Sequence, residues 1–184
     1  MHYTFSDYIV DLVQNSIEAK SSLVIVDLVE EEGRVKLYIS DNGTGMDQEE
    51  LKKVKDPFFT DAKKHKTRET VGLGISFMAQ LASQCGATFD VASEKGVGTS
   101  VFFSCSTDNP DMAPLGNIAS AILSCINMSE NCEIKFNRKR GELSYSVLKS
   151  ELLAAVGDIS DAQSLIALRK YLQSQEKTLS KKGT

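Results

Sequence analysis

The stretch D-N-G-T-G-M (Asp41 to Met46) directly follows a run of strand-forming residues, R-V-K-L-Y-I-S at 34–40. An aspartate at a strand end can accept a hydrogen bond from an exocyclic amino group such as that of adenine. The glycines beside it let the backbone approach a flat ring without a Cβ clash. A plain turn stays open as the alternative, since Asn-Gly is a common turn signal. A calcium loop is excluded, because Gly43 and Gly45 occupy ligand positions and no glutamate stands at the twelfth position.

Upstream, residues 4–20 are predicted to form an amphipathic helix. Its apolar stripe consists of Ile9, Leu12, Val13 and Ile17. Asp11 and Asn15 lie one turn apart on the polar side. An amide oxygen is a suitable hard ligand for Mg²⁺, and a nearby carboxylate can orient or deprotonate a water. A solvated helix face is the alternative for this segment taken alone.

Downstream, Gly72-Leu73-Gly74 opens a helix predicted over 72–85. Free backbone N–H groups at a helix start attract phosphate. The pattern is not a dinucleotide fingerprint, because Phe77 stands where a third glycine is needed, and no Walker loop occurs in the chain. Two further strands are predicted near 87–94 and 99–105, joined by the turn K-G-V-G at 95–98, and the pair Gly98-Thr99 marks the start of the second strand.

These four segments, in this order, resemble the nucleotide-binding set of the GHKL ATPases, which include gyrase, a heat-shock chaperone, sensor histidine kinases and mismatch-repair ATPases. The resemblance covers roughly residues 5–105 and implies an ATP-binding domain over 1–105. It implies an α/β (α+β) sandwich of Bergerat type, with a mixed, mostly antiparallel sheet and helices on one face. ATP and Mg²⁺ are the implied ligands.

The resemblance also assigns roles to single residues. Asn15 corresponds to the Mg²⁺ ligand. Asp11 stands where hydrolysing members usually have the longer glutamate, and slow hydrolysis is expected from this shorter side chain. Asp41 corresponds to the contact with the adenine amino group, and Thr99 supports that contact. The remaining implied nucleotide contacts are Gly43, Gly45, Met46, Phe58, Lys64, Gly72, Leu73 and Gly74.

Residues 56–71 form a polar segment before Gly72-Leu73-Gly74, and this segment is expected to be a nucleotide-responsive lid. Its D-P-F-F-T start resembles the phenylalanine box of histidine kinases. Its cations can reach phosphate or lie in a solvated loop: Lys63, Lys64, Lys66 and Arg68.

Beyond residue 105 the sequence predicts a linker at 106–114, a small α/β subdomain at 115–174 and a flexible tail at 175–184. The subdomain would hold a helix near 115–127, a hairpin at 132–147 and one or two helices to about 174, the last capped by Ser160. A short GHKL unit with such a tail looks like the stand-alone ATP-binding proteins that accompany iron-only hydrogenases in anaerobic bacteria.

Composition excludes several classes of protein. The 184 residues are 41% hydrophobic and carry a formal net charge of −4, which argues against nucleic-acid binding through bulk charge. No apolar run is long enough for a membrane span, and the N-terminus lacks signal-peptide character, so a cytoplasmic location is expected. The four cysteines form no C-x-x-C pair and are expected to be reduced, buried thiols.

Three functions stay open from the sequence. The first is a Mg²⁺-dependent ATP-binding protein with slow hydrolysis that signals to a protein partner. The second is a stand-alone serine kinase similar to those that act as anti-sigma factors, and the third is a nucleotide sensor without catalysis. Neither histidine lies on a helix that could carry a sensor kinase's phosphoacceptor, and a dimer is compatible with all three functions.

Overall fold

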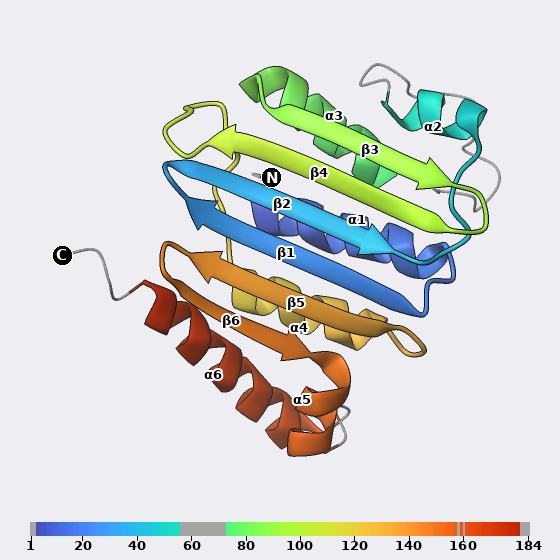
Figure 1. Cartoon of the computed structure of the whole chain (residues 1–184). Helices are drawn as coiled ribbons and strands as arrows, with labels where there is room; N and C mark the ends of the chain where they lie inside the picture. The colour runs from blue at the N-terminus through green and yellow to red at the C-terminus, as the bar shows by residue number, and fades with distance from the viewer. Residues whose placement is uncertain (1–2, 56–72, 158, 160, 181–184) are drawn as a thin grey trace.

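A computed structural model describes residues 3–55, 73–157, 159 and 161–180. In chain order the elements are α1 (Phe5–Glu18), β1 (Leu23–Glu31), β2 (Arg34–Asp41), α2 (Gln48–Lys55), α3 (Leu73–Cys85), β3 (Thr88–Glu94), β4 (Gly98–Ser106), α4 (Ile118–Met128), β5 (Glu133–Arg140), β6 (Leu143–Leu148), α5 (Lys149–Val156) and α6 (Ala162–Leu179). The strands form one six-stranded sheet in the order β3-β4-β2-β1-β5-β6. Helices α1, α3 and α4 cover one face of it (Figure 1). The predicted fold class is confirmed.

The central hairpin of β1 and β2 shows why the sheet has one covered and one open face. Val24, Val26 and Leu28 alternate with more polar residues and are fully buried against the helices. The predicted turn between the strands consists of Glu32 and Gly33, with φ of 51° and 69°. Positive φ at both central turn residues matches the twist of a tight hairpin. All described strand pairs are antiparallel except β1 with β5.

Helix α1 lies at the centre of the helical layer, between α3 and α4 and over β1 and β2 (Figure 1). Its start is fixed by Thr4, whose backbone N–H donates to the Asp7 carboxylate at 2.8 Å. The Phe5 ring is fully buried and lies 5.2 Å from the Phe103 ring of β4, measured between centroids. This packing directs the polar side of α1, with Asp11 and Asn15, toward the start of α3.

The residues after 114 extend the same sheet, because β5 pairs with β1 in parallel along its length. Ile122 of α4 and Phe136 of β5 belong to the same buried cluster as the core of the first hundred residues. The predicted linker is anchored at its end, where the Phe5 N–H donates to the Pro114 carbonyl at 2.7 Å. Whether residues 115–174 form a unit that folds alone stays a prediction.

Helix α4 begins later than predicted, at Ile118. Gly116 has a φ of 78°, and the Asn117 side chain caps the helix by accepting from the Ser120 N–H at 2.9 Å. A left-handed residue followed by an Asn cap therefore delays the helix start.

The last helix differs from the prediction at both ends. Its cap is Asp161, which accepts from the Ser164 N–H at 3.0 Å, whereas the predicted cap Ser160 lies outside the described residues. The flexible tail predicted from residue 175 is wrong up to Leu179, because α6 continues to that residue and its side chain is only 4% exposed. Residues 181–184 lie outside the described part of the chain.

A buried ion cluster explains this extension of α6. Arg138 of β5 pairs with Glu30 of β1 and, at 3.3 Å, with Glu176 of α6. Glu176 also accepts a hydrogen bond of 2.6 Å from the Tyr145 hydroxyl. The guanidinium of Arg138 is almost completely removed from water and is stabilised by this contact with Glu176. Helix α6 therefore continues far enough to place Glu176 beside Arg138. Among the described residues, no helix combines the length and apolar character needed to cross a bilayer.

Candidate functional site

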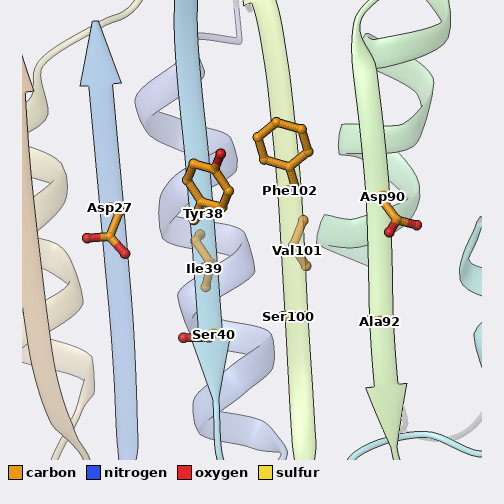
Figure 2. A pocket seen from close by; sticks show the side chains of 9 residues that line it. All are labelled: Asp27, Tyr38, Ile39, Ser40, Asp90, Ala92, Ser100, Val101 and Phe102. Carbon is orange, nitrogen blue, oxygen red and sulfur yellow. The ribbon is translucent and has the colours of Figure 1, made fainter.

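A hollow of about 110 Å³ lies between α1, the first turn of α3 and the inner face of β2 and β4. Leu12, Ile39, Ile75 and Val101 make its apolar part. The rest of its lining includes five predicted site residues from three separate segments: Asn15, Asp41, Gly45, Met46 and Thr99. We call it the inner pocket, to distinguish it from a larger hollow of about 300 Å³ on the opposite, open face of the sheet (Figure 2).

Asp41 at the end of β2 is held by three donors. Ser16 Oγ of α1 donates to one carboxylate oxygen at 2.7 Å, while Ser21 Oγ at 3.1 Å and the Gly43 N–H at 2.8 Å donate to the other. A carboxylate has about four acceptor sites. The arrangement therefore fixes the carboxylate in the pocket and leaves capacity for about one more donor.

The loop after Asp41 is fastened to the chain that leaves α1. Asn42 Oδ1 accepts from the Ser22 and Leu23 N–H groups at 2.9 and 3.0 Å. Gly43 is buried, and a Cβ there would lie 2.6 Å from Ser21 Oγ and 2.7 Å from the Ala19 carbonyl. Gly43 thus does not line the pocket but is required for the close approach that holds Asp41.

The other side of the loop packs against the turn between β3 and β4. Gly45 has a φ of 61°, and a Cβ there would lie 2.0 Å from the Glu94 carbonyl oxygen. The Met46 N–H donates to Ser93 Oγ at 2.8 Å, and Ser93 Oγ lies 2.9 Å from Thr99 Oγ1. Met46 and Thr99 are therefore positioned by one serine that bridges loop and strand.

The polar side of α1 meets the start of α3 at Gly74. A Cβ on Gly74 would lie 2.7 Å from Asn15 Nδ2 and 3.1 Å from the Asp11 carbonyl carbon, so only glycine allows this approach. Asn15 Nδ2 is buried and has no hydrogen-bond partner among the described residues. A buried amide without a partner is costly unless a ligand satisfies it.

Asp11 does not line the inner pocket. Its carboxylate instead accepts a hydrogen bond from the Tyr3 hydroxyl. Burial and this hydrogen bond raise the pKa of Tyr3 above its usual range, so the hydroxyl stays a donor at neutral pH. Tyr3 also contacts the rings of Tyr8 and Phe77, at 4.8 and 6.5 Å between centroids. The candidate general base is thus oriented by an aromatic group near the N-terminus.

Several predicted positions are not described. Phe58, Lys64 and Gly72, together with the whole predicted lid at 56–71, lie outside the described residues. Leu73 begins α3, and nothing is described of its side chain. The roles of all the predicted site residues stay predictions.

Sequence reasoning missed the serines that position the site, Ser16, Ser21 and Ser93. Ser16 and Asp41 are 25 residues apart, and Ser93 and Met46 are 47 apart, so no local pattern connects them. A weak signal was available only for Ser16, which follows the candidate ligand Asn15 on the same helix. Their partners became visible only once the sheet and helices had been assembled.

The residues present fit a nucleotide with Mg²⁺. Among the described residues, no cluster of three His, Cys, Asp or Glu side chains could hold a metal without help. Mg²⁺ commonly needs only one or two protein ligands when substrate phosphates and waters supply the rest. The amide oxygen of Asn15 is a ligand type that suits such a shared site, while its unpartnered Nδ2 is a donor that suits a phosphate oxygen.

Comparison with known proteins identifies the family of the chain. Residues 5–109 match the family described as histidine kinase-, DNA gyrase B- and HSP90-like ATPase. A sensor histidine kinase of Bacillus subtilis, YxdK, is 29% identical over 96 residues, which is 50% of this chain and 30% of that protein. The sensor protein SrrB of Staphylococcus aureus is 38% identical over 71 residues, 38% of this chain and 12% of that protein. The matched stretch thus spans less than a third of these relatives.

Among solved structures, the catalytic domain of the histidine kinase ThkA aligns over 54% of this chain and 64% of its own, with a TM-score of 0.39 and 20% identity. The match to the family's sequence pattern covers more than half of the present chain. The chain therefore belongs to the histidine kinase-, DNA gyrase B- and HSP90-like ATPase family, as the resemblance of its four motifs predicted.

Proposed function

We propose that the inner pocket binds ATP together with Mg²⁺, that hydrolysis is slow, and that the nucleotide state is signalled to a protein partner. The observation that carries the proposal is the Asp41 carboxylate, which has three protein donors and room for about one more. An adenine amino group supplies one such donor. The flat apolar lining from Ile39, Ile75 and Val101 suits a purine ring.

Guanine would fit this pocket poorly, because its carbonyl oxygen would face the fixed carboxylate. An unmatched buried acceptor costs about 1–3 kcal/mol. ATP should therefore bind roughly tenfold to a hundredfold more tightly than GTP. Calorimetric titration of the purified chain with both nucleotides measures this ratio, and equal affinities would contradict the assignment of Asp41.

Asp41→Asn should lower ATP affinity by a similar factor. An amide there would place an N–H₂ group where either the protein donors or the adenine amino group needs an acceptor. Asp27→Asn is the matched control, since it makes the same charge change on the opposite face of the sheet. The control should bind ATP as the unaltered chain does.

Mg²⁺ should strengthen binding through Asn15. Asn15→Ala should remove most of the difference in ATP affinity between Mg²⁺ and chelator. Gln14→Ala on the same helix is the control, because Gln14 is exposed and hydrogen-bonds only to Glu18 among the described residues. An unchanged Mg²⁺ dependence in Asn15→Ala would remove the metal role from this residue.

Transfer of the γ-phosphate to a partner is the second candidate, because one matched relative, YxdK of Bacillus subtilis, is named a sensor histidine kinase. Incubation with γ-labelled ATP separates the two. Released phosphate supports slow hydrolysis, whereas label on a co-purifying protein supports a kinase. Binding with neither outcome supports a sensor without catalysis.

A further inference from the structure

The open face of the sheet carries one row of side chains that differs from its surroundings. Asp27 of β1 is paired with Tyr38 of β2, Tyr38 with Phe102 of β4, and Phe102 with Asp90 of β3. The row therefore reads carboxylate, aromatic, aromatic, carboxylate across four adjacent strands (Figure 2). None of these side chains takes part in the inner pocket, which lies on the other side of the sheet.

A hollow forms beside this row because the next residues on the same face of β2, β4 and β3 have small side chains. Ser40, Ser100 and Ala92 are cross-strand neighbours and cannot fill the space next to two aromatic rings. The resulting hollow has a volume of about 300 Å³. The Tyr38 and Phe102 rings lie 4.6 Å apart between centroids, tilted by 32°, and Tyr38 is 45% exposed. The aromatic wall is thus open to a ligand from solvent.

The carboxylates at the two ends of the row are available to a cation. Asp27 accepts a hydrogen bond of 2.7 Å from Asn137 Nδ2, and no described cation lies within ion-pair distance of it. Asp90 pairs with Lys55 at 3.0 Å, but its side chain is 68% exposed. Such exposed pairs contribute little and exchange readily.

Within the described part of the chain, no basic residue of the same face pairs with Asp27, and only Lys55 pairs with Asp90. Lys36 and Lys139 are both bound by Glu31, at 3.0 and 2.7 Å. Arg34 donates to Ser104 Oγ at 3.0 Å, at the far end of the strands. Lys135 lies on β5 opposite Ile25, outside the row, and forms none of the described ion pairs. Negative charge and aromatic faces are therefore concentrated at one place.

We propose that this hollow docks an extended basic segment of a protein partner. Cations bind over the faces of aromatic rings, and carboxylates at both ends of the row add electrostatic attraction. Adjacent strands are spaced by about 4.8 Å, so the carboxylates of Asp27 and Asp90 lie about 14 Å apart. Residues i and i+4 of an extended chain point to the same side and span about 13 Å. The fitting motif is Arg-x-x-x-Arg, or the same spacing with Lys.

This inference stands whether or not the inner pocket binds nucleotide, because the two hollows lie on opposite faces of the sheet. It names a surface and a chemistry for the partner that the proposed function requires. The two hollows are separated only by the sheet: Ile39 of β2 and Val101 of the neighbouring strand β4 border both of them.

The experiment uses the whole chain and fluorescein-labelled peptides of Gly, Ser and Ala that carry Arg-x-x-x-Arg, Arg-x-Arg or Glu-x-x-x-Glu. Fluorescence anisotropy should show saturable binding of Arg-x-x-x-Arg below about 1 mM. The shorter spacing should bind more weakly, since it cannot reach both carboxylates, and the acidic peptide should not bind.

Variants separate local contact from bulk charge. Asp27→Asn combined with Asp90→Asn should weaken the binding of the Arg-x-x-x-Arg peptide about tenfold. Adding Tyr38→Ser to this double variant should weaken the binding further. Glu142→Gln is the matched control: Glu142 is an exposed carboxylate at the turn between β5 and β6, and its loss should leave binding unchanged.

Urea unfolding and ATP titration of each variant report on the fold and on the inner pocket separately. The proposal is overturned if no peptide binds below 1 mM, if Glu142→Gln weakens binding as much as the double variant, or if both Arg spacings bind equally. It is also overturned if spermine binds through the same aspartates while the peptides do not, since the occupant would then be a small polyamine.

Discussion

Replacing Gly45 with alanine tests whether the loop at 41–46 packs directly on the end of β3. A new Cβ would lie 2.0 Å from the Glu94 carbonyl oxygen, whereas ordinary contact begins at 3.4 Å. Both atoms are fixed to backbone, so loop and strand must separate by more than an ångström. Gly33→Ala is the matched control: its φ of 69° is close to the 61° of Gly45, but nothing lies within 4 Å of its Cβ.

The two variants share one energetic cost and differ in another. A left-handed non-glycine residue costs about 1–2 kcal/mol, which both variants incur. Overpacking adds about 1–3 kcal/mol in Gly45→Ala only. With a urea m-value of about 1–3 kcal/mol per M, the unfolding midpoint of Gly45→Ala should lie roughly 1 M below that of Gly33→Ala.

Urea unfolding followed by far-ultraviolet circular dichroism measures both midpoints. ATP titration of the still-folded variants adds a second readout, in which Gly45→Ala should lose affinity and Gly33→Ala should not. Equal midpoints for the two variants would refute the packing of this loop against Glu94, and with it the account of how Met46 and Asp41 are positioned.

Three further changes test other parts of the molecule. Asp11→Asn should lower ATP turnover by about a hundredfold or more while sparing ATP affinity; turnover that survives in a steady-state phosphate-release assay would place the general base elsewhere. Glu176→Ala should lower the free energy of unfolding by about 1.5–3 kcal/mol, because the buried Arg138 loses a charged partner; Glu151→Ala, an exposed change on α5, should leave the urea midpoint nearly unchanged. Burial raises the pKa of the Cys85 thiol to about 11, above the value of about 8.5 in the unfolded chain. The contribution of the protonated thiol to the free energy of unfolding is therefore complete below pH 8.5 and is lost as pH rises to 11. Urea midpoints at pH 8 and pH 10.5 should therefore differ less in Cys85→Ala than in the unaltered chain, and equal differences would contradict the pKa shift.

Much of the fold could be predicted from the sequence because its determinants are local. The alternation of Val24, Val26 and Leu28, the turn at Gly33 and the apolar stripe of α1 each act within one or two elements. Family membership was also accessible, since it depends on the order and spacing of short motifs. The end of α6 was not, because the polar residues after 174 look like a tail until Arg138 provides a buried charge for Glu176.

The sequence by itself determined the family, the fold class and the candidate residues Asn15, Asp41 and Gly45. Only the tertiary structure decided which donors hold Asp41, that Tyr3 engages Asp11, and that β5 extends the first sheet. The open-face row of Asp27, Tyr38, Phe102 and Asp90 likewise depends on strand register. The physical reason is the same in each case: these contacts join residues far apart in the chain, and their energies depend on burial and geometry that no local pattern encodes.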